Sequence, residues 1–550
     1  MSGDAPPVEL RSLEAGSSAG AKAQPTPGMN AFTAPRAQAW GGHALALAAG
    51  ACTVFSFAPY AVSGLVLVSL TLLLWLWQRA ETARHAAWLG FWFGAGLFGA
   101  GASWLYIAIE MFGGMPPWLA FISIAVLVAY LSLWPAAAGF LAARFAPPGS
   151  IARLAIAVGA FTATEWIRSY LFTGFPWLAL GYSQAPDGLL AGYAQVGGVY
   201  LVTLAIVLAA ALVAYAIDGL ARNARSAIAL AIVGFVLLAV TGAAITRVEW
   251  TRPAGAALDV SLVQGNVLQD VKFDQQFRTN TFDRYLRLVE ESRGRLVVLP
   301  ESAFPMFSDE IPDAVLLSLI RMASARNGDV LLGLFTAEPP EPGGNEPRYY
   351  NTVIALGDSD LQFYRKNHLV PFGETIPLKP LIGWLIRSVL QIPLADQARG
   401  GATQPALNVA GQPVAVNICY EDAFGAELIH GARDAHILVN VTNDAWYGRS
   451  IAAEQHNQIA AMRALELGRP MLRATNTGIT SAIGHDGREI ARLPWFMTGV
   501  LEVSIVGREG ATPYLRFGDA PVLILSALLI GAAFATGRRR TLRWRTGESR

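Results

Sequence analysis

The sequence predicts a membrane protein in two parts: an eight-helix apolar bundle, and an α/β layered domain inserted before the last helix. Three observations predict it: an uneven distribution of charge, a series of long apolar segments, and alternating strand-like and helix-like runs after residue 250. Of the 550 residues, 53% are hydrophobic and only 15% are charged. Soluble domains carry about a quarter charged residues, so this composition disfavours an ordinary cytosolic enzyme.

Charge is concentrated in the second half of the chain. Residues 41–246 contain 12 charged side chains in 206 positions, whereas residues 247–519 contain 56 in 273 and carry a net charge of −6. The first stretch therefore has the composition of a membrane protein and the second that of a soluble domain. The overall charge of +1 averages the two, and no basic stripe indicates a nucleic-acid partner.

Eight apolar segments are candidates for membrane-spanning helices, since about 20 residues are needed to cross the hydrocarbon layer. They are residues 41–57, 61–78, 86–108, 117–143, 151–171, 193–217, 226–246 and 520–537. The first two meet at Ala58-Pro59-Tyr60, which predicts a tight turn. The fifth is the least typical, because it contains Arg153, Glu165 and Arg168.

The arginines of the short loops predict the orientation of the bundle, because Lys and Arg concentrate on the cytoplasmic side. A cytoplasmic N-terminus places there the loop residues Arg79, Arg84, Arg144, Arg153, Arg222 and Arg225. Eight spans return the C-terminus to the same side and leave the soluble part outside. The predicted organisation is a disordered tail (1–40), seven spans (41–247), the soluble domain (255–510), an eighth span (520–538) and a basic cytoplasmic tail (539–550).

The soluble part alternates two kinds of pattern. Runs dense in Val, Ile and Leu predict buried strands at 260–264, 296–299, 330–335, 352–356, 414–419 and 437–441. Helical periodicity covers 275–291, 314–326 and 453–467. This order predicts an α/β layered domain.

Cys419 is the only thiol in the soluble part, and Cys52 lies in an apolar run, so no disulfide framework is expected. Cys419 ends a strand-like run and is followed by the polar Tyr420 and Glu421. A sharp strand-to-helix turn can expose a nucleophile and aim the next backbone N–H at an oxyanion. The alternative is a small cysteine buried in the core.

Two other chemically useful residues also follow predicted strands. Glu301, after Leu296–Pro300, could act as a general base toward a thiol. Lys366, after the run 361–365, could lower the pKa of the thiol and stabilise an oxyanion. Taken alone, Glu301 could equally be a loop acid or a helix cap, and Lys366 a solvated lysine on an edge strand.

Together and in this order, Glu301, Lys366 and Cys419 resemble the catalytic triad of the carbon–nitrogen hydrolase (nitrilase) superfamily. Glu374, in Pro371-Phe-Gly-Glu, matches the frequent second glutamate of that superfamily, which supports the lysine. The resemblance implies an αββα sandwich and a site supported by Glu374, Tyr420 and Glu421.

Longer motifs resemble the apolipoprotein N-acyltransferases, membrane members of this superfamily. They lie at residues 165–178, 181–184, 349–352, 367–374, 443–448 and 462–470, and the resemblance extends from about 41 to 540. It implies eight transmembrane helices in the bacterial inner membrane and a nitrilase-like domain on the periplasmic face.

The same resemblance implies the reaction. An acyl chain would pass from a phospholipid, for which phosphatidylethanolamine is the expected donor, to a thioester on Cys419. It would then pass to the α-amine of the N-terminal diacylglyceryl-cysteine of an apolipoprotein. Phe273 departs from the family, which often has Trp there; an apolar acyl contact would survive this exchange, whereas an indole hydrogen bond would not.

Several residues are candidates for binding or positioning lipid. Trp446 and Tyr447 either line the acyl path or fill core. The apolar run 376–390 is either a mobile arm dipping into the membrane interface or a buried helix. Glu165 and Arg168, one helical turn apart, are expected to form an ion pair that holds the loop 174–177 in place.

Arg168 and Trp177 are also candidates for contact with the substrate. For Arg168 this would be direct binding of the headgroup, its less favoured role. Four polar residues, His456, Arg463, Glu466 and Arg469, are expected to form a structural charge network. No motif for zinc, haem or a nucleotide is present, so no cofactor is expected.

Two alternatives to the acyltransferase stay open on the sequence alone. A membrane-tethered amidase or nitrilase would release its acyl group to water. A transporter with an extracytoplasmic binding domain would predict inverted repeats, broken spans and several charges at mid-membrane, whereas the spans contain few charges and no obvious repeat.

Overall fold

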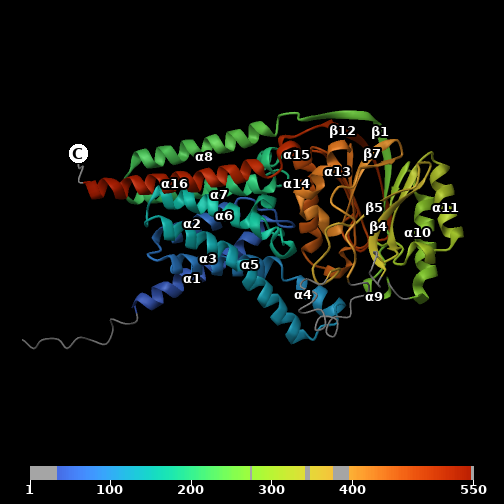
Figure 1. Cartoon of the computed structure of the whole chain (residues 1–550), viewed down its shortest axis with the longest axis horizontal. Coiled ribbons are helices and arrows are strands. Elements are labelled where there is room, and N and C mark those ends of the chain that lie inside the picture. Colours follow the sequence, from blue (N-terminus) through green and yellow to red (C-terminus); the bar gives the residue numbers. More distant parts are fainter. Residues whose placement is uncertain (1–33, 273–274, 341–346, 376–395, 547–550) are drawn as a thin grey trace, which may run out of the picture. The chain divides into compact units, whose positions relative to one another are not determined.

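A computed structural model describes residues 34–272, 275–340, 347–375 and 396–546 (Figure 1). Every predicted apolar segment overlaps a helix. These helices are α1 (Ala34–Thr53), α2 (Leu65–Arg79), α3 (Ala83–Gly101), α5 (Pro117–Phe145), α6 (Ile151–Arg168), α7 (Ala194–Ala221), α8 (Arg225–Ile245) and α16 (Ala520–Thr546). Helix α1 begins seven residues before the expected start at residue 41.

By length and composition, fewer of these helices qualify as complete membrane spans. Among the described residues, three segments pass: α5, Ala191–Ala221 and α8. A bent pair, α3 with residues Leu105–Phe112, would make a fourth. The chain thus carries several apolar helices, and the count of eight spans stays a prediction.

The third apolar segment is broken, although the sequence predicts one span at 86–108. Helix α3 ends at Gly101, and α4 (Leu105–Ile107) with the π-helical turn η2 (Ala108–Phe112) continues at an angle of 61°. A Cβ at Gly101 would lie 2.5 Å from Leu178 Cδ1, so the missing side chain lets the loop after α6 approach the break.

Arg153, the unusual charge in the fifth segment, binds the ends of two other helices. Its Nη1 donates to the carbonyls of Trp77 (2.9 Å) and Ala80 (2.7 Å) at the end of α2. Its Nε donates to the carbonyl of Ala146, directly after α5. Carbonyls at helix C-termini lack intrahelical donors, and a buried arginine satisfies them.

The predicted tight turn at Ala58-Pro59-Tyr60 is confirmed, because Tyr60 N and Ala61 N both donate to the carbonyl of Phe57.

The soluble part contains two six-stranded mixed sheets. The first has the order β12-β1-β2-β3-β4-β5 and the second β11-β10-β9-β8-β7-β6. Their strands are β1 (Thr251–Gln264), β2 (Leu296–Val298), β3 (Asp329–Glu338), β4 (Arg348–Gly357), β5 (Gln362–Arg365), β6 (Leu407–Val409), β7 (Gln412–Ile418), β8 (Ile437–Thr442), β9 (Met471–Thr475), β10 (Ser481–Ile483), β11 (Glu489–Arg492) and β12 (Gly499–Gly510). Each predicted strand lies within one of these or ends one residue beyond it.

Side-chain alternation sorts the domain into four layers. In β2, Leu296 and Val298 share a core with Val439 and Val441 of β8 in the other sheet. Val297 points the other way, into a core with α10 (Arg278–Glu291) and α11 (Asp313–Ser324), and Leu438 of β8 packs with α14 (Ala452–Leu467). The helices α10 and α11 thus cover one sheet, while α14 and α13 (Gly425–Asp434) cover the other (Figure 1). The predicted α/β layering takes the form of an αββα sandwich.

Glycines permit the closest approach between α3 and α5. A Cβ on Gly90 would lie 2.3 Å from the carbonyl oxygen of Pro135, and one on Gly94 would lie 2.7 Å from Ser132 Cα. Backbone atoms cannot retract as a flexible side chain can, so any larger residue at Gly90 must push the two helices apart.

Gly90→Ala is therefore expected to lower the apparent Tm of the protein in detergent, because forcing atoms into a packed interface costs about 1–3 kcal/mol. The matched control is Gly99→Ala on the same helix, where the new Cβ would meet only Val128 Cγ1 at 3.9 Å. Equal melting temperatures for the two variants would contradict the close packing of α3 on α5.

Candidate active site

Cys419 lies at a sharp turn between β7 and the 3₁₀ turn η8 (Cys419–Ala423). Its φ is +54°, a left-handed conformation that a non-glycine residue adopts only when its surroundings enforce it. Asn440 Nδ2 donates to the Cys419 carbonyl at 3.1 Å, and the Ile418 N–H donates to the Glu421 carboxylate at 2.7 Å. The strand-to-turn geometry expected for a nucleophile is present, with the side chain buried at 6% exposure.

Glu301, Lys366 and Glu374 meet as a buried charge cluster. The Lys366 ammonium lies 3.3 Å from Glu301 Oε1 and 2.6 Å from Glu374 Oε1. Asn351 Nδ2 donates to the same Glu301 oxygen at 2.8 Å. The three charged residues come from different places in the first sheet and its loops. Glu301 follows β2, Lys366 directly follows β5, and Glu374 lies eight residues beyond Lys366.

Burial and charge set the resting protonation of this cluster. Burial opposes the charge of Lys366, but Glu301 and Glu374 more than offset it and raise the pKa of the ammonium. Burial also raises the pKa of the Cys419 thiol well above its ordinary value; Glu301 adds to this rise and Lys366 opposes it. The site at rest therefore holds a protonated thiol and a charged ammonium.

Lys272 is a second buried amine at this site, and no sequence motif identifies it. It ends α9 (Gln269–Lys272), is 4% exposed, and donates from Nζ to the Glu301 carbonyl at 3.1 Å. Burial lowers its pKa to about 8, while Glu301 and Cys419 act in the opposite direction. The one signal in the sequence was its position beside Phe273, which lies outside the described residues.

Glu421 joins the loop of Lys366 to the loop of Cys419. Its Oε1 accepts from the backbone N–H groups of Asn367 (2.6 Å) and His368 (3.0 Å), and its Oε2 accepts from Ile418 N–H and from the Tyr364 hydroxyl. Burial raises its pKa to about 7, and the three backbone donors oppose that rise. The position of Glu421 suits the supporting role expected for it.

The loop after α6 contacts the residue that follows Cys419. The Tyr420 hydroxyl donates to the Gly174 carbonyl at 3.2 Å, and the Tyr420 and Trp177 rings stack at 19° with centroids 6.4 Å apart. Trp177 Nε1 donates to Gln455 Oε1 of α14 at 2.7 Å. The helical part thus packs directly against the turn that carries Cys419.

The expected pairing of Glu165 with Arg168 is present, at 3.7 Å. Arg168 Nη1 donates to the carbonyls of Phe175 and Trp177, while Glu165 Oε1 accepts from Leu180 N–H. Arg168 is 1% exposed, as is Trp177. Both candidates for substrate contact are therefore buried behind Tyr420, in positions that hold the loop.

The other lipid-contact candidates lie on the 3₁₀ turn η9 (Asp444–Tyr447). The Trp446 ring meets Phe112 of η2 edge-on at 6.0 Å, and the Tyr447 ring meets Trp104 at 4.6 Å. Both side chains are partly buried and contact the bent segment beyond α3. The apolar run 376–390 lies outside the described residues.

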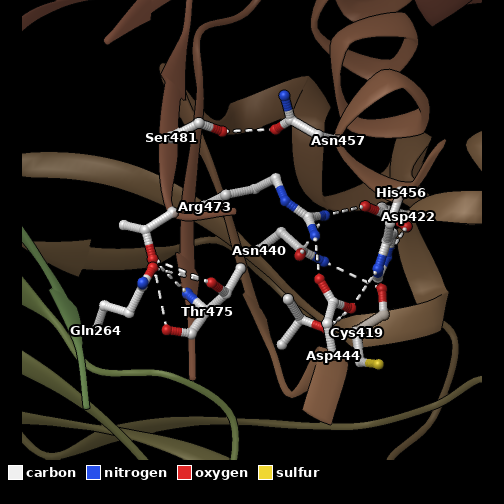
Figure 2. A network of polar contacts seen from close by, with 12 residues as sticks. Gln264, Cys419, Asp422, Asn440, Asp444, His456, Asn457, Arg473, Thr475 and Ser481 are labelled. Atoms are coloured by element: carbon white, nitrogen blue, oxygen red, sulfur yellow. Dashed lines mark hydrogen bonds and ion pairs between the residues drawn. The ribbon is translucent and has the colours of Figure 1, made fainter. Parts of the chain in front are cut away.

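Four charged side chains form a closed ring behind Cys419 (Figure 2). The members are Asp422, Asp444, His456 and Arg473, all at most 2% exposed.

Of the four residues expected to form a structural charge network, His456 belongs to this ring. Arg463 and Glu466 pair with each other at 2.9 Å, and Arg469 binds the carbonyls of Ala435 and Gly510. The part of the chain that the structure describes holds no cluster of three or more His, Cys, Asp or Glu side chains able to bind a metal.

Comparison with known proteins agrees with this arrangement. Residues 49–212 match the family model of the apolipoprotein N-acyltransferase N-terminal domain, and residues 259–514 match that of carbon-nitrogen hydrolases. A protein named apolipoprotein N-acyltransferase from Nitrosomonas europaea is 46% identical over 90% of this chain and 98% of its own length.

Relatives with the same name occur in Chromobacterium violaceum (41% identical, covering 90% of this chain and 93% of the relative) and Methylococcus capsulatus (40%, covering 90% and 96%). Identity at this level over nearly the full length of each relative includes both the helical part and the αββα domain. The chain therefore belongs to the apolipoprotein N-acyltransferase family.

Proposed function

We propose that this protein transfers an acyl chain from a phospholipid, with phosphatidylethanolamine as donor, to the α-amine of the N-terminal diacylglyceryl-cysteine of apolipoproteins. Cys419 carries the chain between them as a thioester. The observation that carries the proposal is the Lys366 ammonium, held by Glu301 and Glu374 beside a buried thiol, in a chain whose full-length relatives bear the name of this enzyme.

The first half-reaction forms the acyl-enzyme. The thiol is protonated at rest, so Glu301 removes its proton as the sulfur attacks the ester carbonyl. The Lys366 ammonium and the Tyr420 backbone N–H stabilise the oxyanion of the tetrahedral intermediate. When the C–O bond breaks, the leaving lysophospholipid oxygen takes the proton from Glu301, so atoms and charges balance.

The second half-reaction consumes the thioester. The acceptor amine must lose a proton before it can attack, and Glu301 is again the carboxylate available to receive one. The C–N bond then forms. As the C–S bond breaks, Glu301 passes that proton to the sulfur, which leaves as a thiol, and the excess proton on the new amide nitrogen then leaves through Glu301 to solvent. A thioester suits this sequence because it stores the acyl group while one lipid leaves and another enters.

The surrounding elements suit two lipid substrates. In the bent segment beyond α3, Phe112 contacts Trp446 and Trp104 contacts Tyr447, so aromatic rings join the helical part to η9. We assign Trp446 and Tyr447, with Phe273, to the acyl path. Arg168 and Trp177 instead position the loop behind Tyr420, because both are buried and bound to protein groups.

The proposal places the enzyme in the bacterial inner membrane with eight spans and the catalytic domain on the periplasmic face. The arginines of the short loops support this orientation. The domain boundaries expected from the sequence, 41–247 for seven spans and 255–510 for the catalytic domain, are retained as part of the proposal.

Purified protein incubated with phosphatidylethanolamine should gain one acyl mass on the peptide containing Cys419, and Cys419→Ala should gain none. Loss of a covalent nucleophile costs roughly 10⁶-fold in rate, so N-acylation of a lipopeptide should fall below detection. Intact-protein and peptide mass spectrometry provide the measurement. Release of free fatty acid without any N-acylated lipopeptide would support the amidase alternative instead.

Lys366→Met should slow formation of the acyl-enzyme by about 10²–10³-fold, because one oxyanion donor is lost. Lys366→Arg keeps the charge and should recover part of the rate. Arg449→Met removes an exposed cation outside the cluster and is the matched control. Single-turnover acylation measured on protein that elutes as a single species distinguishes these effects, and unchanged rates in Lys366→Met would remove the lysine from the mechanism.

The orientation can be tested with one introduced cysteine at a time, in a background that carries both Cys52→Ala and Cys419→Ala so that no native thiol reacts. Leu361→Cys, at a position 73% exposed in the catalytic domain, should react with a membrane-impermeant maleimide in intact spheroplasts. Arg222→Cys, in the loop between α7 and α8, should react only after lysis. The opposite pattern would place the catalytic domain in the cytoplasm.

A further inference from the structure

The ring behind Cys419 is closed by four ionic hydrogen bonds (Figure 2). His456 contacts Asp444 Oδ1 through Nδ1 at 2.8 Å and Asp422 Oδ1 through Nε2 at 3.0 Å. Arg473 contacts the second oxygen of each aspartate, at 2.9 Å to Asp422 and 3.4 Å to Asp444. Each aspartate therefore binds both cations, and each cation binds both aspartates.

The ring connects the elements that surround the nucleophile. Asp422 lies in η8, three residues after Cys419, and Asp444 begins η9, which carries Trp446 and Tyr447. Arg473 Nη1 also donates to Asn440 Oδ1 at 3.0 Å, and Asn440 Nδ2 donates to the Cys419 carbonyl. This cluster thus fixes η8, which carries Cys419, relative to η9, which carries Trp446 and Tyr447.

The charges of the ring balance only when His456 is an imidazolium. Burial disfavours this charge, but Asp422 and Asp444 raise its pKa to about 9 against the opposing effect of Arg473. Both imidazole nitrogens of His456 face carboxylate oxygens. A neutral imidazole would therefore direct the lone pair of its unprotonated nitrogen at one of these oxygens. It would also leave an uncompensated negative charge near Cys419, and Asp444 already resists ionisation of that thiol.

We propose that this ring is the positioning device of the nucleophile, and that the His456 imidazolium must be in place for Cys419 to be acylated. The inference rests on the proposed function, in which Cys419 accepts the acyl chain. His456 does not touch the reacting atoms; it acts by holding η8 and η9 and by neutralising the two aspartates.

The ring also makes acylation depend on pH. The groups that face His456 are Asp422, Asp444 and Arg473, together with the Trp177 ring at 5.3 Å. The pKa of His456 in the fold lies above its ordinary value of 6.5. The contribution of His456 to stability is therefore complete below pH 6.5 and is lost as the pH rises through about 9. Acylation of Cys419 should decline over the same range.

The experiment measures single-turnover acylation of Cys419 from phosphatidylethanolamine in mixed micelles between pH 6 and 10.5. Full-length protein carries Cys52→Ala, so that iodoacetamide labelling of Cys419 provides a second readout of thiol ionisation. His456→Gln keeps hydrogen-bonding capacity without the charge. It should lower the acylation rate by about 10²-fold at pH 7, the cost of a misplaced reacting group, and should abolish the decline near pH 9.

Two further variants keep the inference open to refutation if His456→Gln folds poorly. Gly478→Ala leaves every ring residue intact, but its Cβ would lie 2.2 Å from Asp444 Oδ2, so it should slow acylation by displacing that carboxylate. Asn457→Ala removes the neighbouring side chain on α14, which bonds Glu489 and Ser481 outside the ring, and should preserve both rate and pH profile.

Rates and pH profiles of His456→Gln and Gly478→Ala equal to those of Asn457→Ala would overturn the positioning role. If His456→Gln yields no folded protein, the rate of Gly478→Ala decides the matter. Failure of the proposed function is recognised separately, because the Cys52→Ala parent would then form no acyl adduct on Cys419.

Discussion

The Lys366 ammonium lies between two carboxylates, 3.3 Å from Glu301 and 2.6 Å from Glu374, with 1% of its side chain exposed. A charge buried this deeply is tolerated only because carboxylates pair with it, and losing Lys366 would leave the two carboxylates without their shared cation. The partners come from separate loops at one edge of the first sheet. Their pairing therefore fixes how these loops close, and it brings a positive charge and a proton acceptor to the thiol that the second sheet supplies.

The second sheet holds the thiol by a different means. Glu421 binds the backbone on both sides, at Ile418 before Cys419 and at Asn367 after Lys366. The ring of Asp422, Asp444, His456 and Arg473 fixes the turn from behind. The left-handed conformation of Cys419, with φ of +54°, costs free energy that these bonds offset. Burial raises the pKa of a thiol held this way, and in the proposed mechanism Glu301 removes its proton as the sulfur attacks a bound ester.

Sequence patterns predict the positions at strand ends well, because a run of Val and Leu followed by a polar residue indicates a buried strand with a polar side chain at the edge of the sheet. Glu301, Lys366 and Cys419 were found in this way. The break after Gly101 was not, since it depends on Leu178 packing where a side chain would be. Lys272 and three members of the ring, Asp422, Asp444 and Arg473, were missed for a similar reason. Each is an ordinary charged residue locally, and only long-range pairing such as that of Arg473 with Asp422, 51 positions apart, gives it a role.

Helix α14 shows why the catalytic domain depends on the helical part. All but one of its sixteen residues are buried, including the polar Gln455, Gln458, Arg463 and Glu466. Gln455 accepts from the indoles of Trp104 and Trp177, and Glu466 accepts from Val199 N–H at 2.6 Å. A polar helix face normally faces water. Here it is satisfied by backbone and indole groups of the helical part, so separating the two would leave those groups unpaired on both sides. The described residues from 43 onward accordingly form one compact unit, in which the aromatic contacts of η9 are held in place relative to Cys419.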